Sequence, residues 1–144
     1  MLSLALNYSS SLAQPLWWQE GKMFHCIGTI TPTNVNSTGN ANPYVAGGDT
    51  LDLTQFFNLA SSAPGMLLPT VELVAEALIY SAPLVATPAP ATLQLYRYVK
   101  GTTLSNGTMQ VFPSTTPQIE LAAGNYPAAV LADVIQIHAL FVMP

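Results

Sequence analysis

The sequence has very little charge. It contains three Lys or Arg residues and seven Asp or Glu residues, so that 7% of its 144 residues are charged. Soluble domains average about 25% charged residues, and a small protein that acts alone usually keeps more charge than this for solubility. We therefore infer that much of the surface is covered by partners in a permanent assembly.

Basic residues are scarcer than acidic ones, and this argues against nucleic acid as a partner. Lys22, Arg97 and Lys100 are the whole set of Lys and Arg, and the net charge is −4. Binding to nucleic acid needs a stripe of such residues to neutralise phosphates. We expect no nucleic-acid partner.

Cysteine and long apolar runs are also scarce. Cys26 is the single cysteine, which excludes a disulfide framework and a multi-cysteine metal site; its apolar surroundings favour a small buried residue over a nucleophile. Residues 134–143 form one of the longest apolar stretches, well short of the ~20 residues of a spanning helix. Residues 1–6 resemble the start of a signal peptide but lack a basic region. We expect a non-secreted protein with no membrane partner.

The rest of the chain is typical of an all-β protein. Twelve prolines leave little room for long helices, because an interior proline costs a helix about 3 kcal/mol. The segments between them alternate apolar and polar side chains, as strands do. Strands are predicted at 23–31, 71–80, 92–99, 108–112, 118–121 and 133–142, with a hairpin through the Asn-Gly turn at 106–107 and with Ile119 and Leu121 inward.

Two segments of this pattern need comment. Glu72 and Glu76 are four residues apart, which also fits a helix, but bracketing prolines and β-branched residues favour a strand there. A helix is expected only as one short turn, with Thr54 as its N-cap and Phe56 facing inward together with Leu59 or Ala60. Short strands separated by turns predict one antiparallel β-sandwich or jelly-roll domain over residues 22–144.

Residues 1–21 precede the first predicted strand and are expected to form an extended N-terminal arm. Trp17 and Trp18 would project to different sides of this arm, so that one can pack on its own domain and the other on a neighbour; Trp is enriched at interface hot spots. At the other end, Phe141, Val142 and Met143 would be an aggregation hazard if exposed. Burial in the sandwich or against a sister subunit removes it. These five residues are the interface candidates.

The stretch 44–53 carries the most recognisable motif, Tyr-x-x-Gly-Gly-Asp-x-Leu-x-Leu. Gly47 and Gly48 permit a positive φ or a close backbone approach. Asp49 can cap the turn by accepting hydrogen bonds from backbone N–H groups two or three residues on, and Leu51 and Leu53 then anchor the segment in the core. We interpret the motif as a structural turn.

The order of a strand, a polar loop, this motif, a short helical turn and a later hairpin resembles small virion structural proteins of tailed bacteriophages, of the capsid decoration or minor capsid type. The resemblance covers residues 23–142 in general order, and its specific part is the 44–53 motif. It implies a sandwich or jelly-roll module, often trimeric, on the virion surface with the major capsid protein as partner. The Pro/Ala-rich segment 81–91 departs from the pattern.

The expected function is therefore a non-enzymatic capsid decoration, cement or minor capsid protein that forms a homo-oligomer, in the first place a trimer. An alternative is a carbohydrate- or receptor-binding sandwich on a viral or cell surface, with Tyr44, Tyr96 and Tyr98 supplying aromatic stacking.

A small hydrolase is a third alternative. A triad could combine one of many serines with His25 or His138 and with Asp49, Asp52 or Asp133, but the sequence has no Gly-x-Ser-x-Gly elbow. Both histidines lie inside strand patterns, which favours interface or core roles. Asp49 and Asp52 could bind Ca²⁺, although turn capping explains them too. We expect no cofactor, no metal and no catalytic residues.

The charge deficit predicts how contacts with partners respond to salt. Apolar contacts are not screened, so raising NaCl from about 0.1 M to about 1 M, which shortens the Debye length from about 10 Å to 3 Å, should leave the assembly intact. Sedimentation of the assembly at both concentrations measures this. Release of the protein at moderate salt would contradict an apolar interface.

Overall fold

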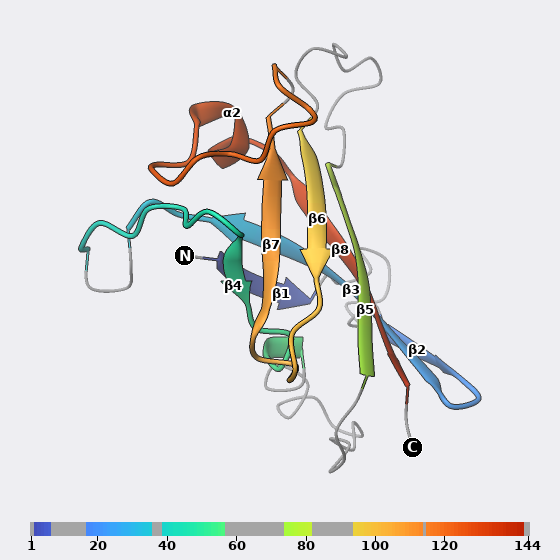
Figure 1. The fold of residues 1–144 in the computed structure, drawn as a ribbon. Helices are drawn as coiled ribbons and strands as arrows, with labels where there is room; N and C mark the ends of the chain where they lie inside the picture. Colours follow the sequence, from blue (N-terminus) through green and yellow to red (C-terminus); the bar gives the residue numbers. More distant parts are fainter. Residues whose placement is uncertain are drawn as a thin grey trace.

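The computed structural model describes residues 2–6, 17–35, 39–56, 74–81, 94–113 and 115–142 (Figure 1). These residues form two antiparallel sheets, one of five strands and one of three, with the core between them. The predicted all-β sandwich is confirmed, and the jelly-roll topology stays a prediction. Among these residues there is no helix long and apolar enough to cross a membrane.

The larger sheet is built around two long strands, β3 (Met23–Pro32) and β8 (Ile135–Val142). They pair from Met23 opposite Val142 to Ile30 opposite Ile135. β5 (Val74–Ser81) pairs with the other edge of β8. This confirms a strand for the segment that also fitted a helix, although Glu72 lies outside the described residues.

The predicted N-terminal arm is corrected by the structure. Residues Leu2–Leu6 form β1 and Trp17–Glu20 form β2, and both pair with the same edge of β3. β1 lies along the second half of β3 and β2 along the first half (Figure 1). Without them β3 would expose a row of unpaired backbone groups at the sheet edge.

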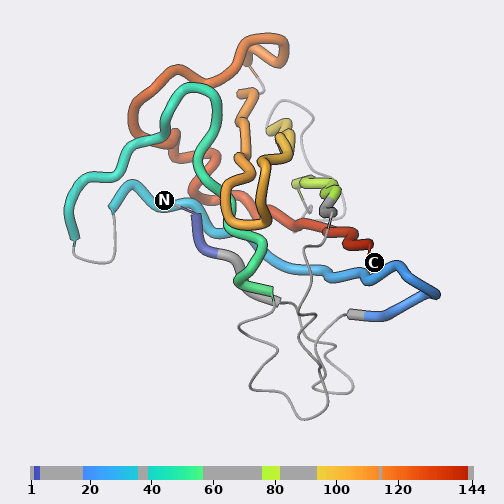
Figure 2. Tube along the Cα trace, turned by 60° about the horizontal axis from the view of Figure 1, so that its bottom comes forward, coloured from blue at the N-terminus to red at the C-terminus, as the bar shows by residue number. Residues whose placement is uncertain are grey.

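The smaller sheet has the order β4 (Asp49–Leu51), β7 (Gly107–Phe112) and β6 (Leu95–Val99). β6 and β7 form the predicted hairpin. This sheet lies across the larger one (Figures 1 and 2). At one side Asp133 joins the two sheets, because its carboxylate accepts hydrogen bonds from Ser81 Oγ and Tyr96 Oη, each at 2.6 Å.

Alternation along the central strands decides which side chains enter the core. Every second residue of β3 and of β8 is buried, and the residues between them are only half-buried or exposed. The buried hydrophobic core is Leu2, Phe24, Cys26, Ile30, Tyr44, Leu51, Leu53, Phe56, Ile79, Met109, Val111, Tyr126, Val130, Ile135, Ile137, Ala139 and Phe141.

Three local predictions are corrected. Residues 118–121 do not form a strand, and Ile119 is 66% exposed, because this segment turns back through the Ile119 N–H to Thr116 carbonyl bond. A short helix, α2 (Ala128–Leu131), follows Pro127 and was not expected. At the turn before Phe56, Asp52 rather than Thr54 is the capping side chain: it accepts from the Thr54 N–H and hydroxyl. Phe56 is buried as predicted, and residues 59 and 60 lie outside the described ranges.

The Gly-Gly turn yields a stability prediction. Gly48 has φ +102°, and a Cβ there would lie 2.9 Å from the Met109 carbonyl oxygen, whereas Gly47 has φ +95° and nothing within 4 Å. Gly48→Ala should lower the free energy of unfolding by about 2–4 kcal/mol through backbone strain and overlap. Gly47→Ala should cost about 1–2 kcal/mol from the backbone alone. Urea unfolding measures both; equal losses would contradict the close approach at Gly48.

Candidate functional site

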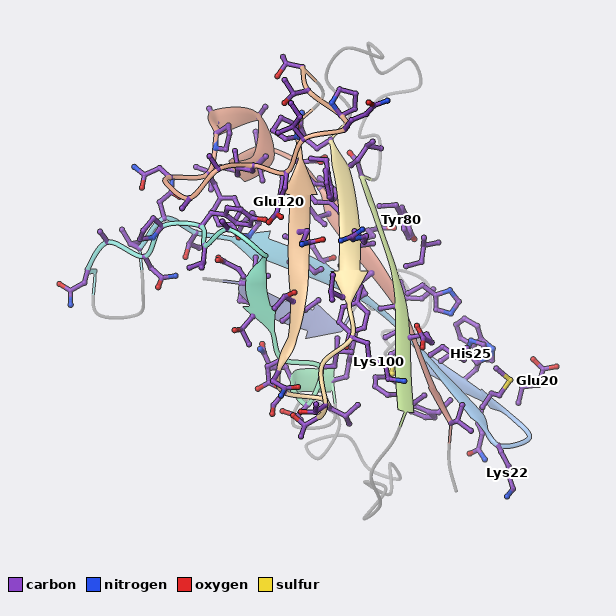
Figure 3. All side chains as sticks on the ribbon, in the orientation of Figure 1. Glu20, Lys22, His25, Tyr80, Lys100 and Glu120 are labelled. Carbon is purple, nitrogen blue, oxygen red and sulfur yellow. The ribbon has the colours of Figure 1, made fainter. Side chains whose placement is uncertain are left out.

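The side of the larger sheet that faces away from the smaller one carries an unusual number of apolar side chains. We call this surface the outer face. In Figure 3 the labelled side chains of His25 and Tyr80 project to this side. Its apolar and aromatic described members, from β2, β3, β5 and β8, are Trp18, Met23, His25, Ile27, Leu78, Tyr80, His138, Leu140 and Val142, and the exposed Glu20 and Glu76 lie on the same face.

Five of these side chains are exposed to solvent by more than a third. Trp18 is 41% exposed, Met23 39%, Leu78 64%, Tyr80 37% and Val142 43%. Since a large side chain carries about 150–250 Å² of surface, these five expose on the order of 400 Å². That is as large as the largest apolar patch of a typical monomer, about 300–600 Å², and such patches often mark binding sites.

Charge on the outer face is sparse. Glu76 on β5 is paired with Lys100, whose Nζ lies 3.5 Å from Glu76 Oε1. Both side chains are well exposed, so this pair contributes only about 0.2–1 kcal/mol to stability. Its main consequence is that Glu76 adds little net charge to the face, where Glu20 on β2 is a further exposed carboxylate.

An aromatic cluster stands at the centre of this face. Trp18 and His25 are directly opposite each other in the β2–β3 pair, and their rings stack with centroids 4.5 Å apart and planes 7° from parallel. His138 on β8 is diagonal to His25, and its ring is tilted against both neighbours, 5.4 Å from Trp18 and 5.3 Å from His25. Cross-strand neighbours on one face come within reach of each other in this way.

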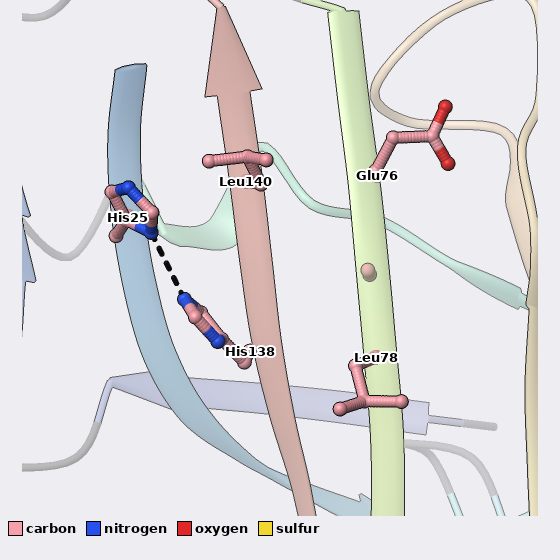
Figure 4. A pocket seen from close by; sticks show the side chains of 6 residues that line it. His25, Glu76, Leu78, His138 and Leu140 are labelled. Atoms are coloured by element: carbon pink, nitrogen blue, oxygen red, sulfur yellow. Dashed lines mark hydrogen bonds between the residues drawn. The ribbon is translucent and has the colours of Figure 1, made fainter. Parts of the chain in front are cut away.

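The two histidines also contact each other through nitrogen atoms. His25 Nδ1 lies 3.1 Å from His138 Nε2, which is hydrogen-bond distance (Figure 4). Burial lowers the pKa of His138, and the neighbouring His25 lowers it further. The pair borders a shallow groove of about 290 Å³, lined by His25, Glu76, Ala77, Leu78, His138 and Leu140.

The sequence could not bring the two histidines together, because they are 113 residues apart and meet only through the β3–β8 register. Both side chains are half-buried, and their expected interface or core role stays a prediction. The one signal available was that both histidines lie inside strand patterns.

The 44–53 motif forms a second polar cluster, and it organises the turn. Asp49 Oδ1 accepts from the Val45 N–H at 2.9 Å, and Oδ2 accepts from Tyr126 Oη at 2.7 Å. The predicted role of Asp49 as a capping residue is thus correct, but its backbone donor lies four residues before it, not after it. Both glycines have positive φ, and Leu51 and Leu53 are buried, as predicted.

Glu120 also stabilises the Gly-Gly turn, through three hydrogen bonds. It accepts from Tyr44 Oη at 2.5 Å, from the Gly47 N–H at 2.7 Å and from Gln110 Nε2 at 3.2 Å. Burial and these carboxylates raise the pKa values of the Tyr44 and Tyr126 hydroxyls above their ordinary value, so both act as neutral donors. No local pattern predicted that Glu120 would meet the motif, because it lies 73 residues after Gly47.

Among the described residues, the carboxylates and histidines considered for a hydrolase or a calcium site have other hydrogen-bond partners. Asp49, Asp52 and Asp133 bond to Tyr126, Thr54, Ser81 and Tyr96, whereas the two histidines bond to each other. Within the described ranges no three His, Cys, Asp or Glu side chains gather as a metal site would require. Burial raises the pKa of the Cys26 thiol to about 12, which leaves it unreactive at neutral pH.

The three tyrosines proposed for sugar stacking are buried or half-buried inside the domain. Tyr44 is fully buried, and the half-buried Tyr96 donates its hydroxyl to Asp133. Tyr98 is half-buried against Gly107. These three rings do not form an exposed platform.

The structure describes the side chains of three of the five interface candidates. Trp18 and Val142 lie on the outer face, more than 40% exposed. Phe141 is fully buried between Phe24 and Phe56, so the sandwich core removes the aggregation hazard at this position. The side chain of Trp17 and all of Met143 lie outside what the structure describes.

Comparisons with protein-family models, with curated proteins and with solved structures found no match. The candidate site is therefore argued from the geometry of this chain alone. The outer face, with its histidine pair, is the site the geometry favours.

The buried Tyr126–Asp49 contact predicts a measurable loss. Tyr126→Phe removes a donor to a buried carboxylate and should lower the free energy of unfolding by about 1–2 kcal/mol. Tyr80→Phe removes the hydroxyl of an outer-face tyrosine that is 37% exposed, and should change stability by less than about 0.5 kcal/mol. Thermal unfolding of both variants measures the difference, and similar losses would argue against a structural role for the buried contact.

Proposed function

We propose that the chain is a non-enzymatic virion structural protein, a capsid decoration, cement or minor capsid protein, whose outer face binds neighbouring subunits. The observation that carries the proposal is the apolar outer face, with five large side chains between 37% and 64% exposed. The charge content of 7% supports a surface that is covered in the working state. The resemblance in segment order supports the virion assignment.

The mechanism would be mechanical. Apolar burial contributes about 25 cal/mol per Å², and a standard contact buries about 800 Å² per partner. The outer face supplies a large part of such an area. The surplus left after the cost of association would hold neighbouring subunits of the major capsid protein together against internal pressure.

A homotrimer fits the distribution of exposed apolar residues. A ring of three needs a heterologous contact between two different surfaces of each subunit. The smaller sheet offers a second surface with apolar side chains, where Leu95 is 52% and Val99 37% exposed on β6 and the exposed Arg97 lies between them. The proposal places the outer face of one subunit against this second surface of the next.

The proposed contact can be broken by one charge. Leu78→Glu places a carboxylate at the most exposed apolar position of the outer face, and should weaken self-association at least about tenfold, because burying an unpaired charge costs well over 1.4 kcal/mol. Size-exclusion chromatography with light scattering over a range of concentrations measures this; the native chain should give the mass of three subunits.

Ile119→Glu is the matched control. Ile119 is 66% exposed, against 64% for Leu78, but it lies in a loop away from the outer face. It should leave self-association unchanged. A native chain that stays monomeric at all concentrations, or equal weakening by both variants, would contradict the proposal.

A further inference from the structure

The two histidine rings present nitrogen atoms to each other, His25 Nδ1 and His138 Nε2, at a separation of 3.1 Å. We propose that His25 and His138 form a two-imidazole binding site for a divalent transition-metal ion of the Ni²⁺, Cu²⁺ or Zn²⁺ class. This site goes beyond the proposed structural function and does not depend on it. It is built from the nitrogen separation, the ring stacking and the groove beside the pair.

The separation of the two nitrogens suits a shared ion. With metal–nitrogen bonds of about 2.0–2.1 Å, two nitrogens 3.1 Å apart subtend an angle of about 100° at the ion. This lies between the right angle of a tetragonal site and the tetrahedral angle. The ring that donates in the present contact would move its proton from the facing nitrogen to its other nitrogen, so that both facing nitrogens offer a lone pair. A rotation of the rings would then aim these lone pairs at the ion.

The surroundings hold the rings in place. Trp18 stacks flat on His25 and also contacts His138, so one indole fixes both imidazoles. Both histidines stand on paired strands rather than on a loop. Sites whose ligands are locked by such neighbours lose less freedom when the ion binds.

The chemistry of the donors and the groove sets the class of ion. Neutral imidazole suits Zn²⁺, Cu²⁺ and Ni²⁺, whereas Mg²⁺ and Ca²⁺ prefer oxygen ligands. The groove of about 290 Å³ opens beside the pair (Figure 4). It leaves room for water at the positions that the two histidines do not fill. The described residues bring no third ligand to the pair.

Tryptophan fluorescence gives a readout of the position of the ion. Ni²⁺ is paramagnetic and quenches a nearby indole, and Trp18 is in ring contact with both histidines. Titration of the full chain with Ni²⁺ at neutral pH should give saturable quenching with one ion per chain. Zn²⁺ should compete for the same site, and Mg²⁺ should not.

Three variants assign the site. His25→Gln and His138→Gln should each weaken Ni²⁺ binding, measured by calorimetry, by at least about tenfold, which is the loss seen even for supporting residues at metal sites. Trp18→Phe keeps an aromatic ring beside His25, so it should weaken calorimetric binding less than either His→Gln variant while it reduces the quenching. Far-ultraviolet circular dichroism would establish that each variant is folded.

Several outcomes would overturn the proposal. These are the absence of saturable Ni²⁺ binding, unchanged affinity in both His→Gln variants, or no quenching in Trp17→Phe, which keeps Trp18 as the single tryptophan. The last two would place the ion elsewhere on the chain. Because Trp17→Phe keeps both imidazoles and Trp18, the test remains decisive even where a His→Gln variant fails to fold.

Discussion

The antiparallel pairing of β3 with β8 is the interaction on which the rest of the structure depends. Its register places Phe24 opposite Phe141 on the core side. The alternate residues of the same two strands, His25 and His138 among them, stand on the outer face. One register therefore creates both the core and the surface proposed for binding, and a slip by one residue would exchange them.

Three of the acidic residues connect separate segments of the fold through hydrogen bonds. Asp133 ties β5 to β6 through Ser81 and Tyr96, while Asp49 and Glu120 hold the Gly-Gly turn through Tyr126 and Tyr44. Carboxylates that accept several hydrogen bonds can be buried at low cost. With these acids used in this way, the described part of the outer face carries two carboxylates, Glu20 and the Glu76 that is paired with Lys100, which suits a largely apolar contact between subunits.

Local patterns predicted what depends on neighbours in sequence. The strands at β3, β5 and β8, the β6–β7 hairpin, and the positive φ of Gly47 and Gly48 all follow from alternation and turn chemistry. One failure depends on distant partners: β1 and β2 are strands because the edge of β3 is there to pair with them. Other failures are local, since Ile119 is exposed where its segment turns back through a bond to Thr116, and Asp52 instead of Thr54 caps the turn before Phe56. The histidine pair needs the register itself.

Hydroxyl-radical footprinting of the assembled protein shows whether neighbouring subunits cover the outer face. We expect Trp18, Met23 and Tyr80 to be oxidised more slowly in the assembly than in dilute, dissociated protein. Ile119 and Leu131, which are exposed elsewhere, should react equally in both. Equal oxidation of the three outer-face residues in both states would contradict this coverage.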